Sequence, residues 1–248
     1  MVSLLESIEQ YAADLEKIGA APPPAPRWNQ DWFPRLDAAA AYAMVRSTRP
    51  KRIVEVGSGH STRFLARAVA DGGLDTEIIA IDPQPRATIE KLSVQWLRTP
   101  VQRVAAFPAL AANDILFIDS SHQLKPGSDV EFLLSAVLPM LPAGVRVHFH
   151  DIFLPDDYPA HWGWRRYNEQ AAVAALVERN ILAVEFASHA TVTRQPETLT
   201  GVLARGSGSI AVMRVASLPS AMARAMNRVE CPEPTSTMRR GGSFLTMA

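Results

Sequence analysis

The stretch Arg52-Ile-Val-Glu-Val-Gly-Ser-Gly-His-Ser-Thr62 decides the fold. An apolar run that contains Glu55 ends at two glycines, Gly57 and Gly59, and small hydroxyl residues follow. This pattern is typical of a buried strand that stops at a tight turn, where bare backbone can approach a ligand. A second apolar run ends at Asp82. Together the two runs predict one half of a nucleotide-type binding pocket.

Strand-like and helix-like segments alternate downstream of Arg52. The expected strands are residues 53–56, 78–81, 101–105, 115–118, 145–149, 182–187 and 209–215. Apolar residues at helical spacing predict helices between most of them, one of which runs through Ile89, Leu92 and Trp96. Another begins at Ser128 with Glu131 three residues on, which is a capping box. Such alternation indicates a parallel sheet covered by helices on both faces.

The ends of the chain differ from this alternating region. We expect residues 1–36 to form an N-terminal helix and cap segment, residues 37–216 the main domain, and residues 217–248 a poorly ordered tail. The apolar seam from Leu4 to Ile18 has helical spacing, and it either lies on its own domain or pairs with a second copy of the chain. Trp28, Trp32 and Phe33 predict a segment that packs over the main domain or serves as a substrate lid.

Composition excludes several classes of function. The 25 basic residues balance the 25 acidic ones, so no broad field indicates a nucleic acid or an anionic membrane as partner. Cys231 is the only cysteine, which excludes an internal disulfide and a cysteine-built zinc site. No apolar run is long enough to span a bilayer, and the N-terminus lacks the layout of a signal peptide. We therefore expect a soluble cytoplasmic protein.

The glycine turn departs from a dinucleotide fingerprint. That fingerprint requires a third glycine where Thr62 stands, which weakens a nicotinamide site without excluding it. A carboxylate at Glu55, inside the strand, suits a ligand that carries positive charge near the turn. A nicotinamide-dependent oxidoreductase remains an alternative at this point.

Several motifs together resemble a known family. Glu55-Val-Gly-Ser-Gly-His-Ser-Thr62, followed by Ile79-Ala-Ile-Asp82 and Asp114-Ile-Leu-Phe-Ile-Asp119, resembles the class I methyltransferases that use S-adenosylmethionine. His148-Phe-His-Asp-Ile-Phe-Leu-Pro155 and Tyr167-Asn-Glu-Gln170 are similar to a bacterial small-molecule subgroup of that family. The resemblance covers residues 27–216. It implies a Rossmann-like, doubly wound sheet of seven mostly parallel strands, the last of them antiparallel, with the cofactor over the carboxyl ends of the first strands.

The resemblance also implies which residues bind S-adenosylmethionine. They are Glu55, Gly57, Ser58, Gly59, Ser61, Thr62, Asp82, Phe107 and Asp119. Among them, the glycines let the backbone approach the methionine portion, while Glu55 orients the turn and the amino group. Asp82 accepts both ribose hydroxyls rather than capping a helix. No polar residue follows the expected third strand, so adenine packs against Phe107.

Polar residues at two later strand ends supply candidates for chemistry. Asp119 follows the fourth strand, and His150 and Asp151 follow the fifth. Methylation of a hydroxyl requires the loss of its proton to a general base or to a metal that lowers its pKa. The catalytic candidates are Asp119, His122 and His150.

The metal candidates are Asp119, His150 and Asp151, for Mg²⁺, Mn²⁺ or Zn²⁺, in similarity to the metal-dependent small-molecule O-methyltransferases. The alternative is that the two aspartates bind substrate or cap helices while His150 acts as the base. The predicted function is methyl transfer to a small-molecule hydroxyl. A non-catalytic, cofactor-binding partner subunit is the remaining alternative.

Overall fold

The computed structural model describes residues 3–199 and 211–216. The α-helices are α1 (Leu4–Gln10), α2 (Ala12–Glu16), α3 (Arg35–Thr48), α4 (His60–Asp71), α5 (Asp129–Phe132), α6 (Glu169–Glu178) and α7 (Ser188–Arg194). The strands are β1 (Arg52–Val56), β2 (Glu77–Ile81), β3 (Gln95–Leu97), β4 (Ile115–Ile118), β5 (Arg146–Phe149), β6 (Leu182–Ala187) and β7 (Ala211–Val215). The tail predicted for residues 217–248, which contains Cys231, lies outside the described residues.

The seven strands form one sheet in the order β3-β2-β1-β4-β5-β7-β6. Strands β1 to β5 are mutually parallel, and β7 runs antiparallel to both of its neighbours, β5 and β6. The carboxyl ends of β1, β2, β4 and β5 therefore meet at one edge of the sheet. The predicted doubly wound fold, with an antiparallel last strand, is confirmed.

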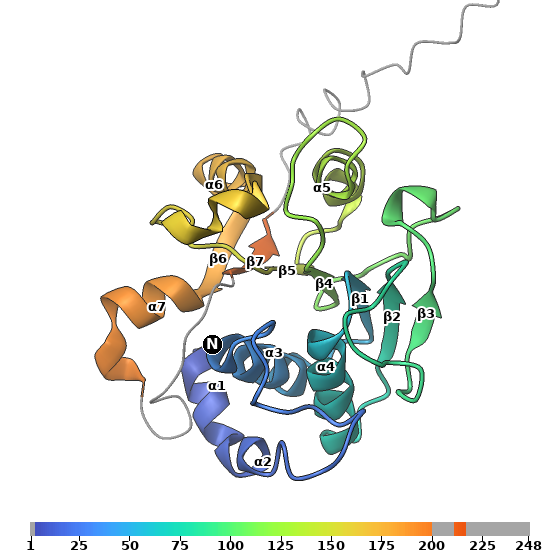
Figure 1. Ribbon diagram of the computed structural model, residues 1–248, viewed down its shortest axis with the longest axis vertical. Helices are drawn as coiled ribbons and strands as arrows, with labels where there is room; N and C mark the ends of the chain where they lie inside the picture. Colours follow the sequence, from blue (N-terminus) through green and yellow to red (C-terminus); the bar gives the residue numbers. More distant parts are fainter. Residues whose placement is uncertain (1–2, 200–210, 217–248) are drawn as a thin grey trace, which may run out of the picture. The chain divides into compact units, whose positions relative to one another are not determined.

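Side chains that alternate along each strand enter two separate cores. In β1, Ile53 packs with α3 and α4 on one face, while Val54 and Val56 pack on the other face with residues that include Leu133 and Val173. Figure 1 shows α1 to α4 on one side of the sheet and α5 and α6 on the other. Because both faces are covered, the strands read as nearly continuous apolar runs.

The sequence-based prediction fails between β2 and β4. No helix runs through residues 89–96, because residues 89–94 form short turns and Gln95–Leu97 pairs with the sheet instead. The third strand is the three-residue β3, which pairs with β2. The predicted strand 101–105 is instead a 3₁₀ turn (Val101–Arg103) that follows Pro100.

The N-terminal segment packs on its own domain. The predicted helix is broken at Tyr11 into α1 and α2, and Ile8, Leu15 and Ile18 of its seam are buried in the core shared with α3. Pairing of this seam with a second copy remains a prediction. Further along, Phe33 lies 5.9 Å from the ring centroids of both Phe64 and Phe117, so this part of the segment packs over the sheet. Among the described residues, no helix is long and apolar enough to cross a membrane.

Candidate functional site

The glycine turn after β1 is required by close crossings of the backbone. Gly57 has a φ of +82°, and a Cβ placed there would lie 1.8 Å from the carbonyl oxygen of Asp119. Gly59 has a φ of +153°, and its Cβ would lie 3.2 Å from the amide nitrogen of Ala87. The first glycine thus lets the ends of β1 and β4 meet, and the second admits the loop that follows β2.

Glu55 supports this turn from inside the protein. Its side chain is fully buried and accepts hydrogen bonds from Ser61 Oγ and Thr62 Oγ1, each of 2.6 Å. Thr62 Oγ1 in turn accepts a hydrogen bond from the amide of Gly59. Burial raises the pKa of Glu55 to about 8, against the hydrogen bonds from the two hydroxyls. None of Glu55, Ser61 and Thr62 lines the adjacent pocket, so the structure places them as its support.

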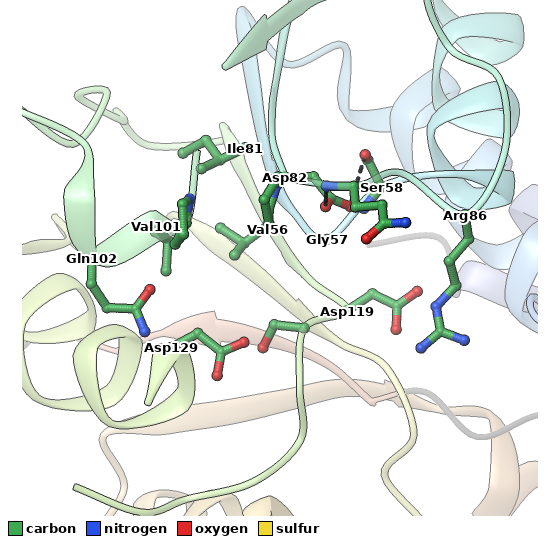
Figure 2. A pocket seen from close by; sticks show the side chains of 14 residues that line it. Val56, Gly57, Ser58, Ile81, Asp82, Arg86, Val101, Gln102, Asp119 and Asp129 are labelled. Carbon is green, nitrogen blue, oxygen red and sulfur yellow. Dashed lines mark hydrogen bonds between the residues drawn. The ribbon is translucent and has the colours of Figure 1, made fainter. Parts of the chain in front are cut away.

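A cavity of about 310 Å³ lies over the carboxyl ends of β1, β2 and β4 (Figure 2). Its lining includes Gly57, Ser58, Asp82, Arg86, Val101, Gln102, Asp119 and Asp129. Asp82 lies at the centre of the cavity, where one carboxylate oxygen accepts hydrogen bonds from the backbone and hydroxyl of Ser58 at 2.6 and 3.0 Å. The other oxygen accepts the amide of Gln84 at 2.7 Å, so Asp82 caps a turn while it faces the cavity.

Phe107 does not line this cavity, and the prediction that places adenine against it needs correction. Phe107 lines a separate apolar hollow together with Phe132 and Met140. The error follows from the misplaced third strand. Because β3 ends at Leu97, the residues that follow it into the cavity are Val101 and Gln102 of the 3₁₀ turn.

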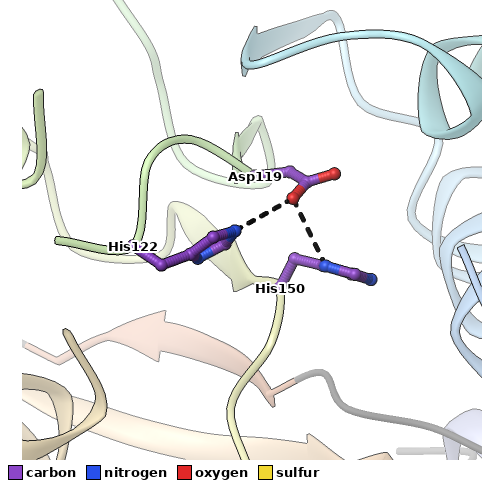
Figure 3. Close-up of side chains that lie close together, drawn as sticks. All are labelled: Asp119, His122 and His150. Atoms are coloured by element: carbon purple, nitrogen blue, oxygen red, sulfur yellow. Dashed lines mark hydrogen bonds and ion pairs between the residues drawn. The ribbon is translucent and has the colours of Figure 1, made fainter. Parts of the chain in front are cut away.

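A cluster of ionisable side chains adjoins the cavity at the ends of β4 and β5. One oxygen of Asp119, Oδ1, lies 3.3 Å from His122 Nε2 and 3.3 Å from His150 Nδ1 (Figure 3). Asp151 is 3.3 Å from His150 and 3.8 Å from His122. The four polar candidates named for chemistry and metal binding are thus brought together, and Asp119 also lines the cofactor-sized cavity.

Two further carboxylates, Asp37 and Glu169, complete the cluster, and neither was selected as a site residue from the sequence. Glu169, at the start of α6, lies 3.0 Å from His122 Nδ1. Asp37, in the first turn of α3, lies 3.7 Å from His150 Nε2. Both side chains are almost completely buried. A signal was present, since Glu169 stands in the Tyr167–Gln170 motif and Asp37 is the one acid of an alanine-rich helix.

The backbone of the cluster is unusual as well. His122 and Asp151 have φ angles of +56° and +51°, in the left-handed region that non-glycine residues seldom adopt. Such a conformation costs about 1–3 kcal/mol and persists where the surroundings impose it, often at functional sites. Here it accompanies side chains that turn toward Asp119.

The carboxylates shift the pKa values of both imidazoles upward. Burial alone would lower the pKa of His150, but the charges of Asp119 and Asp151 raise it to about 9. The same competition raises the pKa of His122 well above its usual value, through hydrogen bonds with Asp119 and Glu169. The imidazoles in turn hold the pKa of Asp119 far below its usual range, against the effect of burial.

The donor set also fits a metal ion. Asp119, His122 and His150 each offer one ligand atom, and these atoms lie within 4.8 Å of one another. Both nitrogens of His150 are buried and have no hydrogen-bond partner of good geometry among the described residues. A mixture of imidazole nitrogen and carboxylate oxygen suits Zn²⁺ and Mn²⁺ better than Mg²⁺. This set contains His122, whereas the predicted set contained Asp151 in its place.

His148 does not belong to this cluster. It is fully buried and its ring stacks on Phe117 at a centroid distance of 3.9 Å. Burial lowers its pKa well below the usual value, so the ring is neutral. It is a core histidine, although its nitrogens have no hydrogen-bond partner among the described residues.

Comparison with known sequences decides between the two enzyme classes. Residues 54–152 match the profile of a family described as a methyltransferase domain. The chain carries a methyltransferase domain. The match contains the glycine turn, Asp82, and the Asp119, His122, His150 and Asp151 part of the cluster, and the sheet order agrees with it. The predicted S-adenosylmethionine-dependent methyltransferase of class I fold is therefore confirmed, and the nicotinamide alternative is set aside. No curated protein sequence matches the chain.

Solved methyltransferases are similar to this chain at low identity. A methyltransferase from Podospora anserina, bound to S-adenosylhomocysteine, is 18% identical over 86% of this chain and 88% of its own, with a TM-score of 0.48. The O-methyltransferase from Bacillus cereus, also bound to S-adenosylhomocysteine, is 14% identical over 87% and 92%, with a TM-score of 0.45. TomG from Streptomyces achromogenes, an O-methyltransferase of tomaymycin synthesis, is 16% identical over 88% and 91%, with a TM-score of 0.45. These likenesses do not identify this methyltransferase's acceptor.

Proposed function

We propose that this methyltransferase transfers the methyl group of S-adenosylmethionine to a hydroxyl oxygen of a small molecule. The observation that carries the proposal is the double position of Asp119, which lines the cofactor-sized cavity and also joins the buried cluster of carboxylates and imidazoles. A sulfonium transfers its methyl group by in-line displacement, so the enzyme chiefly aligns the acceptor and excludes water. A hydroxyl must in addition lose its proton, and the cluster beside the cavity contains the carboxylates and imidazoles that can promote this loss.

The cluster would hold a divalent cation through Asp119, His122 and His150, with Asp151 beside them. When bound, such a cation supplies Lewis acidity that lowers the pKa of an acceptor hydroxyl. The donor set supports this assignment, since four carboxyl groups surround only two imidazoles, and neither nitrogen of His150 has a hydrogen-bond partner of good geometry among the described residues. Asp37 and Glu169 would then orient the two imidazole rings from behind, as outer partners of metal-bound histidines commonly do.

Aromatic residues after β5 are suited to form the acceptor side of the site. The ring of Tyr167 lies 4.6 Å from the ring of His122. Trp162 and Tyr158 each pack edge-on against Tyr167, at 5.9 Å. These side chains limit the access of water to the cluster and offer apolar faces to a planar acceptor. A phenolic or otherwise unsaturated hydroxyl compound fits these surroundings.

Mass spectrometry of a methyl-transfer reaction tests the proposal. Purified protein, S-adenosylmethionine and a panel of phenols, catechols and aliphatic alcohols should yield O-methylated product from at least one hydroxyl acceptor. Asp119→Asn and His150→Gln should each lower kcat by about 100-fold or more, because they remove groups beside the reacting oxygen. Asp156→Asn is the matched control, since this acid pairs with His189 and Arg194 away from the cluster. Cofactor binding without turnover of any acceptor would favour the partner-subunit alternative.

The metal is tested separately. Elemental analysis of the purified protein should find about one divalent ion per chain, and His122→Gln should lose it while Asp156→Asn retains it. The metal assignment would be wrong if the wild-type protein contained no metal and a chelator left its activity unchanged. In that case a group of the cluster would accept the proton of the acceptor hydroxyl directly. The cytoplasmic location and the pairing of copies through the N-terminal helix remain proposals. Cell fractionation and sedimentation of the full chain test them.

A further inference from the structure

Arg86 lines the cofactor-sized cavity, and its charge has no acidic partner in the part of the chain that the structure describes. It lies in the loop after β2, and its amide donates a hydrogen bond to the carbonyl of Ser58, at 3.1 Å. The guanidinium lies 4.2 Å from the ring centroid of Trp32. Within the described ranges 3–199 and 211–216, no carboxylate forms an ion pair with Arg86. An arginine beside a cavity that keeps all its donors available is suited to an anion.

The indole that supports Arg86 is itself fixed. Gln30 Oε1 accepts hydrogen bonds from the amides of Trp32 and Phe33, at 2.8 and 2.7 Å. Phe33 is buried beside His150, whereas Trp32 is 47% exposed. The turn is thus anchored by Phe33 and presents Trp32 at the surface, where it holds the guanidinium through a cation–π contact.

The position of Arg86 along the cavity indicates which part of a ligand it meets. Figure 2 shows Val101 and Gln102 at one end of the cavity, Asp82 at its centre, and Arg86 with Asp119 at the other end. With the ribose at Asp82 and the adenine toward Gln102, the methionine portion extends toward Arg86. The transferred methyl group would lie near Asp119, so an acceptor approaches the same end.

We propose that Arg86, held by Trp32, binds a ligand carboxylate beside the transferred methyl group. The carboxylate belongs either to the methionine portion of the cofactor or to the acceptor, and the acceptor source rests on the proposed function. A guanidinium matches a carboxylate in a bidentate manner, and it offsets the negative charge of Asp82, Asp119 and Asp129 around the cavity. Trp32 acts as a positioning residue that limits the orientations of the arginine.

Calorimetry with the full chain tests the cofactor source. The probes are S-adenosylhomocysteine and its decarboxylated analogue, which keeps the amino group and lacks only the carboxylate. Arg86→Met should weaken S-adenosylhomocysteine by about tenfold and leave the analogue unchanged. Arg98→Met is the matched control, because Arg98 stacks on Trp96 in the same manner but lies outside the cavity lining.

A second arm tests the acceptor source. The affinity for 3,4-dihydroxybenzoate is compared with the affinity for its neutral amide, in the presence of saturating S-adenosylhomocysteine. If Arg86→Met lowers the affinity about tenfold for the benzoate alone, the carboxylate belongs to the acceptor. Trp32→Leu should weaken the same ligand by about threefold, and should have no further effect in the Arg86→Met background. The proposal is overturned if Arg86→Met changes none of these affinities, or weakens charged and neutral partners equally. Neither of these two results would contradict the proposed function, which is tested separately by mass spectrometry of methyl transfer with the wild-type protein.

Discussion

Gly57→Ala gives the sharpest test of how the turn builds the site. The new Cβ would lie 1.8 Å from the carbonyl oxygen of Asp119, and protein Cβ atoms essentially never approach closer than 3.0 Å. The end of β4 would therefore have to move by about 1.2 Å. The positive φ adds about 1–2 kcal/mol, and the overpacking adds about 1–3 kcal/mol. We expect a loss of about 2–5 kcal/mol, a large part of the typical 5–15 kcal/mol stability of a domain.

The same displacement should damage function. Asp119 Oδ1 lies 3.3 Å from both His122 and His150, so a shift of this size separates the three groups. The assays are guanidinium denaturation for stability, calorimetry for S-adenosylhomocysteine, and elemental analysis for metal. We expect loss of metal and at least tenfold weaker cofactor binding at a temperature where the variant is still folded.

Gly127→Ala is the matched control, because it separates backbone strain from collision. Gly127 has a φ of +77°, close to that of Gly57, but its Cβ would meet no heavy atom within 4 Å. This variant should lose only about 1–2 kcal/mol and should bind the cofactor normally. If Gly57→Ala lost no more stability than Gly127→Ala, and bound S-adenosylhomocysteine like the wild type, the reasoning from the β1–β4 crossing would be refuted.

Three further predictions concern the cofactor side. Because burial raises the pKa of Glu55 to about 8, the folded protein keeps a proton on this carboxyl group that the unfolded chain releases near pH 4.5. The free energy of unfolding should therefore fall as the pH rises from about 5 to 8. Denaturation curves of Glu55→Gln should lack this dependence on pH. Phe107→Ala should leave the affinity for S-adenosylhomocysteine unchanged while Gln102→Ala weakens it, and the opposite ranking would restore the adenine site at Phe107. Asp82→Asn should weaken S-adenosylhomocysteine by about tenfold or more, yet bind a 2′,3′-dideoxy analogue like the wild type; equal loss for both ligands would argue for the turn alone.

The parts of the fold that the sequence predicted well are those in which local pattern and tertiary role coincide. Strands β1, β2, β4 and β5 are buried on both faces, so their apolar runs are long and end at turn residues. The convergence of Asp119 with His150 followed from strand ends alone, because parallel neighbours end at one edge of the sheet. The prediction of a strand over residues 101–105 was wrong. Its valines favour a strand, but the edge strand β3 already ends at Leu97, and the residues after Pro100 form a 3₁₀ turn.

The missed residues have a different physical cause. The contact between Glu169 and His122 joins positions 47 residues apart, and it depends on where α6 starts relative to the sheet. Ser61 and Thr62 were expected at the cofactor, but their hydroxyls turn inward to Glu55. Residue type and spacing show that such a group is polar and near the turn, but the direction of its side chain is fixed only by tertiary packing.

This difference separates the cofactor side of the site from the acceptor side. The cofactor cavity is built at strand ends within residues 54–152, where Gly57, Asp82 and Asp119 each directly follow a predicted strand. The cluster depends in addition on Asp37 of α3 and Glu169 of α6, which hold the two histidines from outside that region. Trp32 and Tyr167, which flank the methyl-transfer end, also lie outside it. Exchanging the segments around these four residues between related enzymes should therefore change the acceptor, while the affinity for S-adenosylhomocysteine changes by no more than the roughly threefold effect expected of Trp32→Leu.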